Sequence, residues 1–196
     1  MTTAHPVIRF DLDRDVRTVE AMAARLVPYV YEDEIYGQMS SDLPKLTFGG
    51  LLMRLHRLSA IANNLLSPQQ QAVLHKAQEE LDKVRKEWAT AYEKKLEGEL
   101  KMRITQLEQF IAECGESARA CAENYPSSIE KRVIAEHLKD EAQARNALPT
   151  TLKGGLSSAD AKLRRHVKAG DFIWDKRLEP AYPRDKFWFL YAAPAG

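Results

Sequence analysis

One long amphipathic segment, residues 69–121, constrains the fold of this chain more than any other feature. Apolar residues recur along it at spacings of three and four, which is the period of one helix face. No proline interrupts it, and opposite charges four residues apart, such as Glu79 with Lys83 and Glu99 with Arg103, support a solvated outer face. The segment therefore predicts a helix built for packing within an all-α protein.

The buried stripe of this segment changes sides near its middle. A helix turns by about 100° per residue, so the thirteen residues from Ala91 to Ile104 leave a net rotation of roughly 220° after whole turns are subtracted. The two half-stripes therefore face nearly opposite directions. A continuous rod of about 80 Å with antiparallel helical hairpins at both ends satisfies this pattern. A break near Gly98 would instead give a four-helix bundle. We favour the continuous rod, because a lone glycine costs only about 1 kcal/mol and no second turn residue accompanies it.

Helices are predicted on both sides of the rod. Residues 48–66 carry an apolar stripe, and Ser67 with Pro68 and Gln70 has the pattern of a capped helix start. At the far end we expect Pro126 to end the rod and Ser127 to start a helix that runs to residue 148. These two turns predict the helical hairpins.

The remaining segments suggest four regions. An extended arm at residues 7–10 precedes a helix that Pro28 should kink or split. Sixteen aromatic residues occur in the chain, and seven of them lie in its last 26 residues, where they predict a small β-like hairpin or strap. The expected regions are the N-terminal arm and kinked helix (1–47), the helical body (48–148), a basic loop and short helix (149–170), and an aromatic C-terminal strap (171–196).

The cysteines and the overall composition exclude several classes of protein. Cys114 and Cys121 would lie about 10.5 Å apart along one helix, too far for a disulfide with each other, so we expect two small buried side chains or a crosslink in a parallel homodimer. The chain opens with no secretory signal, its longest apolar run falls short of a membrane span, and its net charge is only +1. We therefore expect a cytoplasmic protein with no membrane partner.

The positive charge is concentrated late in the chain, where residues 127–170 hold nine basic and five acidic side chains. The diglycine at 154–155 and a serine-capped helix from 157 or 158 to about 168 would add free backbone N–H groups. An ordinary solvated helix is the simpler interpretation. The alternative is a contact for anions or nucleic acid made by Lys153, Lys162, Arg164, Arg165 and Lys168.

The aromatic tail has two interpretations. Aromatic side chains could fill the core of a thin bundle, which is the simpler use. They could also dock a protein partner, because tryptophan and tyrosine are frequent at binding hot spots. The candidate docking residues are Trp174, Phe187, Trp188 and Tyr191.

No set of side chains in the sequence assembles a catalytic, metal or cofactor site. We therefore expect a non-enzymatic helical adaptor or scaffold that acts through protein partners or self-association. The alternative is a nucleic-acid-associated protein that uses residues 153–168. A helical-bundle enzyme or metal-binding protein is the third hypothesis.

Overall fold

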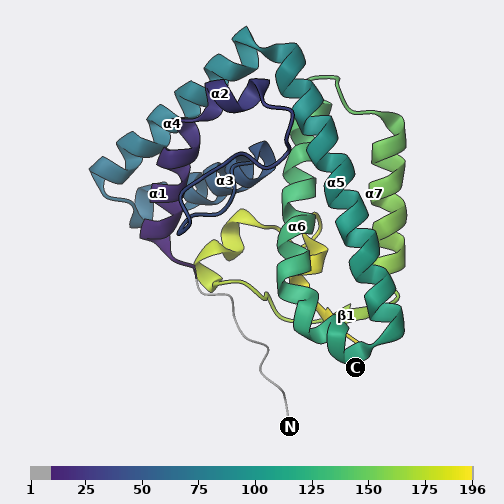
Figure 1. The fold of residues 1–196 in the computed structure, drawn as a ribbon. Coiled ribbons are helices and arrows are strands. Elements are labelled where there is room, and N and C mark those ends of the chain that lie inside the picture. Colours follow the sequence, from purple (N-terminus) through teal and green to yellow (C-terminus); the bar gives the residue numbers. More distant parts are fainter. Residues whose placement is uncertain (1–9, 196) are drawn as a thin grey trace.

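The chain forms helices with one small sheet. In this computed structural model, which describes residues 10–195, the helices are followed by a two-stranded sheet, so the predicted all-α class with a small C-terminal β segment is confirmed. Figure 1 shows α4 and α5 meeting at an apex, while α5, α6 and α7 lie side by side. The α-helices are α1 Leu12–Ala23, α2 Leu26–Tyr31, α3 Phe48–Leu65, α4 Pro68–Glu87, α5 Ala89–Glu116, α6 Ala118–Ala144 and α7 Thr150–Leu163.

The N-terminal helices follow the sequence prediction closely. Asp11 caps α1 by accepting a hydrogen bond from the backbone N–H of Arg14 at 2.9 Å. The chain then breaks, and Pro28 lies in the first turn of α2, where its missing N–H costs nothing. The predicted split around Pro28 is therefore confirmed. Of the predicted arm, residues 7–9 lie outside the described residues.

The helix predicted over residues 48–66 is confirmed as α3, and the capped start that follows is confirmed as the beginning of α4. The hydroxyl of Ser67 accepts from the backbone N–H of Gln70 at 3.3 Å, and the Gln70 side chain accepts from the N–H of Ser67 at 2.9 Å. These reciprocal bonds satisfy two backbone donors that the helix would otherwise leave unpaired.

The continuous rod over residues 69–121 is wrong. The helix ends at Glu87 and restarts at Ala89, because Trp88 leaves the helical conformation with φ −125° and ψ 38°. A bend here lets the two half-stripes face different partners, with α4 packed on α1 and α5 packed on α6. Gly98, the expected site of any break, lies inside α5, where an added Cβ would come within 2.9 Å of Ile35 Cδ1. An alanine at this position would require only the end of the half-buried Ile35 side chain to move.

The second break also differs from the prediction. Ser117, not Ser127, starts the next helix, and its side chain accepts from the N–H of Ala120 at 3.2 Å. Pro126 lies inside α6 although an interior proline costs about 3 kcal/mol. Packing offsets that cost, because the neighbouring Tyr125 is buried and its hydroxyl donates to the backbone carbonyl of Phe189 at 2.8 Å.

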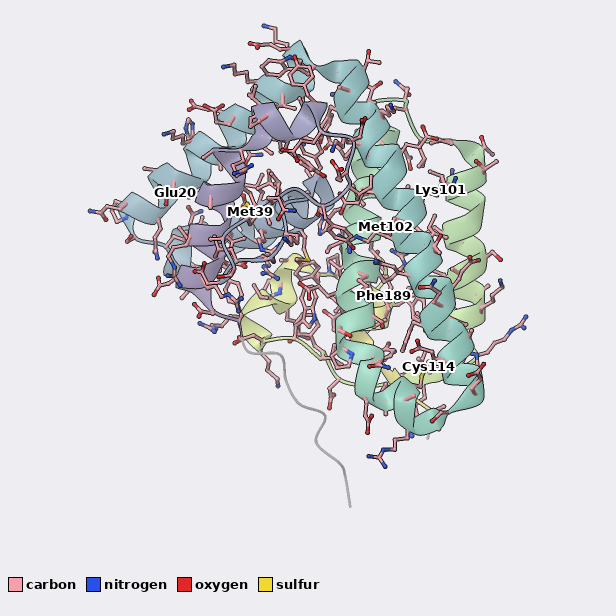
Figure 2. All side chains as sticks on the ribbon, viewed as in Figure 1. Glu20, Met39, Lys101, Met102, Cys114 and Phe189 are labelled. Atoms are coloured by element: carbon pink, nitrogen blue, oxygen red, sulfur yellow. A yellow bond between two sulfur atoms is a disulfide. The ribbon has the colours of Figure 1, made fainter. Side chains whose placement is uncertain are left out.

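The tight turn between α5 and α6 brings the two cysteines together. Cys114 and Cys121 form a disulfide, with their Cα atoms 4.4 Å apart. The sequence prediction excluded this bond because it placed both residues on one helix, whereas the turn at Ser117 puts them on two antiparallel helices. Figure 2 labels Cys114 at this end of the bundle.

The C-terminal region needs three corrections. Helix α7 begins at Thr150, so Gly154 and Gly155 lie within it and offer no free backbone N–H groups, and it ends at Leu163 rather than near 168. The predicted aromatic strands do not form. The strands instead flank the aromatic residues and pair antiparallel: β1 Val167–Ala169 with β2 Ala192–Pro194. Between them lie the two 3₁₀ helices η1 Lys176–Ala181 and η2 Trp188–Tyr191.

Helix α3 is held at its N-terminus by a carboxylate from α5. The buried side chain of Glu99 accepts from the backbone N–H of Gly49 at 2.8 Å and from Arg103 at 2.9 Å. An added Cβ on Gly49 would lie 2.6 Å from Ile134 Cγ2, so glycine allows α3 to touch both α5 and α6. This contact fixes the N-terminus of α3, the helix that carries Arg54 and Arg57.

Candidate functional site

The basic residues predicted to form one contact are spread over the surface. Lys153 is exposed near the start of α7, and Lys162 pairs with Glu108 at 3.7 Å. Arg165 is exposed beyond the end of α7. Arg164 and Lys168 line a common hollow, and the other three basic side chains lie outside its lining.

The predicted docking aromatics lie mostly in the core. Trp174, Phe187 and Tyr191 are 3%, 2% and 7% exposed, whereas Trp188 is half-buried. Tyr182, which was not singled out in the sequence, packs edge-to-face against Trp174 and Phe187 with ring centroids 5.1 and 4.9 Å apart. Core packing is the use that this arrangement favours for the tail.

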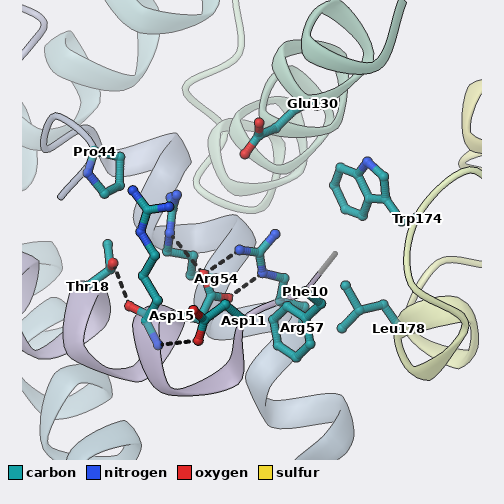
Figure 3. Close-up of a pocket in the computed structure, with 11 residues that line it drawn as sticks. Phe10, Asp11, Asp15, Thr18, Pro44, Arg54, Arg57, Glu130, Trp174 and Leu178 are labelled. Atoms are coloured by element: carbon teal, nitrogen blue, oxygen red, sulfur yellow. Dashed lines mark hydrogen bonds and ion pairs between the residues drawn. The ribbon is translucent and has the colours of Figure 1, made fainter. Parts of the chain in front are cut away.

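A pocket that the sequence did not reveal lies between α1, α3, α6 and the C-terminal segment. Its volume is about 280 Å³. Figure 3 shows the side chains that surround it, and we call it the arginine pocket. It is lined by Phe10, Asp11, Arg14, Asp15, Thr18, Pro44, Arg54, Arg57, Glu130, Trp174 and Leu178.

Two guanidinium groups in the wall of the arginine pocket share one carboxylate. Arg57 binds Asp15 through both Nε and Nη2, and the Nε of Arg54 lies 3.4 Å from the same carboxylate. Arg54 also donates from Nη1 to the backbone carbonyl of Gly50 at 2.8 Å. These three side chains are only 8–11% exposed. The cluster thus buries two positive charges against one negative charge.

The shared carboxylate does not serve the two arginines equally. Burial acts to lower the pKa of Arg57, but the hydrogen bonds and charge of Asp15 outweigh it, so this pKa is raised. Burial and then the charge of Arg57 lower the pKa of Arg54, and Asp15 only partly offsets them. Arg54 is therefore the less compensated cation of the pair.

The rest of the pocket lining adds one cation, Arg14, and two carboxylates, Glu130 and the helix-capping Asp11. Arg14 is exposed at the rim and donates from Nη2 to the backbone carbonyl of Asp42 at 3.1 Å. Glu130 projects from α6 on the side opposite Asp15 (Figure 3). Within residues 10–195 it forms no ion pair. The pocket therefore has a cationic wall and a carboxylate facing it.

Apolar rings hold the guanidinium of Arg57 in place. Its Cζ lies 5.3 Å from the centre of the Phe10 ring and 6.0 Å from that of Trp174. These cation–π contacts and the two bonds to Asp15 fix the plane of the group, and within residues 10–195 its Nη1 makes no hydrogen bond. Arg57 is thus preorganised, and the pocket combines charge with an apolar side.

A buried arginine in the bundle of α5, α6 and α7 provides a contrast inside the same protein. Arg132 on α6, which is 3% exposed, donates to Glu136 at 2.9 Å and to Asp160 of α7 at 2.7 and 2.8 Å. Lys139 also binds Glu136. Burial acts to raise the pKa of Glu136, but the charges of Arg132 and Lys139 outweigh it, so this pKa is lowered. Here two cations meet two carboxylates.

The sequence contained a weak signal for the arginine pocket. Arg54 and Arg57 are three residues apart on a helix whose apolar stripe predicts burial, and Asp15 immediately precedes Val16 of another such stripe. Charges beside a buried stripe are candidates for paired, functional groups. Their meeting, across 42 positions of sequence, required the tertiary fold.

The described residues contain no group of three or more His, Cys, Asp and Glu side chains placed to hold a metal ion. None of the helices between residues 10 and 195 is both long and apolar enough to cross a membrane. No protein-family model, curated protein or solved structure matches this chain.

Proposed function

We propose that this protein binds a small organic anion in the arginine pocket, with the oxyanion held by Arg14, Arg54 and Arg57. The observation that carries the proposal is the sharing of one carboxylate, Asp15, by two buried guanidinium groups in the pocket wall. A bound carboxylate or phosphate would add negative charge beside Arg54, whose Nε makes no hydrogen bond in the part of the chain that the structure describes. Arginine forks suit both groups because they donate two parallel hydrogen bonds.

The energetics favour uptake of an anion. A buried charge without full compensation is costly, and hydrogen bonds to charged groups contribute about 1.5–3 kcal/mol each. The pocket already contains oriented donors, so a ligand would not have to order them. A volume of about 280 Å³ is at the small end for ligand pockets, which favours a metabolite-sized molecule.

The walls suggest what else the ligand carries. Phe10, Trp174 and Leu178 would cover an apolar part, since each lines the pocket. Glu130 faces the cationic wall and would repel a ligand that is anionic at both ends. A ligand with an oxyanion at one end and an ammonium or other donor at the other end fits both sides.

The test is a binding measurement with three probes: phosphate, succinate and glutamate. Calorimetric titration of the wild-type protein should give saturable binding of at least one, and Arg54→Met should abolish it. Arg17→Met is the matched control, because Arg17 is exposed on α1 and lies outside the pocket lining. Equal loss of binding in both variants, or no saturable binding to any probe, would contradict the proposal.

Glu130 offers a second, opposite-signed test. Removal of its charge in Glu130→Gln should strengthen binding of succinate and phosphate, because a repulsive carboxylate has gone. The same change should weaken binding of glutamate if its ammonium group faces Glu130. Parallel changes for all three probes would show that Glu130 does not select the ligand.

A further inference from the structure

A second surface brings together residues from both groups that the sequence singled out. Arg164 at the end of α7 and Lys168 on β1 come from the basic segment, while Trp188 and Tyr191 come from the aromatic tail. Arg184 completes the set. We call this the cation–aromatic surface. It lines a hollow of about 240 Å³ and shares no residue with the arginine pocket.

The geometry of this surface pairs each arginine with a ring. The Cζ of Arg164 lies 3.7 Å from the centre of the Trp188 ring, and that of Arg184 lies 4.7 Å from the centre of Tyr191. Arg164, Lys168 and Arg184 are all exposed. Stacking on a ring restricts a guanidinium group to one plane while its outer face and N–H edge stay accessible.

The charge of the surface has one sign. Three cations line the hollow, and no carboxylate of residues 10–195 does. Its floor is apolar, with Val167, Ala169 and Ala192 contributed by the paired strands β1 and β2. A matching ligand therefore needs negative charge at its edge and a flat apolar group at its centre.

We infer that the cation–aromatic surface binds single-stranded nucleic acid. A base would stack on the outer face of the Arg164 guanidinium group, which is itself stacked on Trp188. Lys168 and Arg184 would contact the flanking phosphates. Bases stacked on arginine planes and aromatic rings, beside cations that follow the backbone, are the usual means of binding single strands. An acidic peptide would pair with the three cations, but it would place no flat ring on the exposed face of the Arg164 guanidinium group.

The inference is tested with a fluorescein-labelled ten-nucleotide oligouridylate and the full-length protein. Anisotropy should rise on binding at low salt. The two phosphate contacts, from Lys168 and Arg184, predict that the logarithm of the affinity falls against the logarithm of the salt concentration with a slope of about −1.4. Salt-independent binding, or none at low salt, would overturn the inference.

Two charge reversals form a matched pair. Lys168→Glu should lower the affinity for the oligouridylate at least fivefold and should make its dependence on salt concentration less steep. Lys153→Glu should change the affinity less than twofold, because Lys153 is equally exposed but lies near the other end of α7. Equal effects of the two changes would indicate unspecific charge attraction and would refute the site.

Stacking has its own readout in tryptophan fluorescence. The oligouridylate should quench the emission of wild-type protein and of Trp88→Phe, since Trp88 lies at the apex between α4 and α5. The quenching should be lost in Trp188→Phe. Quenching that survives in Trp188→Phe, or inorganic polyphosphate that binds as tightly as the oligouridylate, would exclude a stacked base.

Discussion

The α5–α7 bundle and the α1–α3 region both bury arginine, but they balance its charge differently. In the bundle, Arg132 and Lys139 meet the carboxylates of Glu136 and Asp160. Between α1 and α3, Arg54 and Arg57 share Asp15 as their one ion-pair partner within residues 10–195, and the cluster forms the wall of a pocket. A buried cation with matched partners serves the fold, whereas a surplus cation beside a cavity is available to a ligand. The number of carboxylates paired with each buried cation therefore distinguishes a structural cluster from a candidate binding site.

The largest effect should come from the balanced cluster. Arg132→Met leaves Glu136 and Asp160 without their main cation, and breaking a buried pair on one side costs about 3–5 kcal/mol. Urea unfolding measures the loss. Arg119→Met is the control, because the Arg119–Glu123 pair is largely exposed and should contribute little. A loss below about 1 kcal/mol in Arg132→Met would remove the contrast between the two regions.

The disulfide adds a covalent constraint to the bundle side only. Reduction, or replacement of both cysteines by alanine, should lower the free energy of unfolding by about 2.5 kcal/mol, because the bond closes a loop of about eight residues in the unfolded chain. Hydrogen exchange should increase first at the ends of α5 and α6 that meet at Ser117. If reduction instead increased hydrogen exchange most in α1 and α3, the disulfide would not stabilise the α5–α7 bundle selectively.

His137 tests the boundary between the two regions, since it lies on α6 and its ring packs 4.7 Å from that of His56 on α3. Burial, and the charges of His56, Lys186 and Arg57, lower the pKa of His137 to about 3. The unfolded chain takes up this proton near pH 6.5, so the stability contribution is full above that pH and falls as the pH drops toward 3.

Between pH 7 and pH 5 the expected loss of unfolding free energy is about 2 kcal/mol, with a limiting slope of about 1.4 kcal/mol per pH unit. His137→Gln removes the titrating group, so its unfolding free energy should change less over the same range. Identical pH dependence in the two proteins would mean that His137 is not held neutral at this boundary.

The smallest effect on stability should come from Arg54→Met. Methionine replaces the less compensated cation with an apolar side chain, and Asp15 keeps its paired contact with Arg57. We expect a change within about 1 kcal/mol in urea unfolding. A loss as large as that of Arg132→Met would make the Arg54 cluster a folding element and would contradict its assignment to ligand binding.

Local sequence signals predicted the elements whose ends depend on local chemistry. The Ser67 cap, the split around Pro28 and the stripe of α3 all follow from neighbouring residues. The sequence does not predict the bend at Trp88, because an apolar stripe that changes sides fits either a continuous helix or two helices joined by a bend. The helices against which α4 and α5 pack determine which of the two forms. Pro126 was misread because packing around Tyr125 outweighs a local helix penalty.

The sites depended even more on tertiary structure. The arginine pocket joins five segments of the chain, so spacing along the sequence could not show it. The basic segment and the aromatic tail were both noticed, but their meeting at Arg164 and Trp188 depends on the pairing of β1 with β2. The disulfide between Cys114 and Cys121 likewise required the turn at Ser117.

The most direct test of the contrast between the two clusters is NMR observation of the arginine Nε–H groups during titration with phosphate, succinate or glutamate. We predict that the signal of Arg54, whose Nε makes no hydrogen bond within residues 10–195, shifts and saturates with at least one of these anions. The signal of Arg132 should stay in place, because its Nε already donates to Asp160. An Arg54 signal that does not move with any of the three anions, or an equal shift at Arg132, would contradict the contrast between the two clusters.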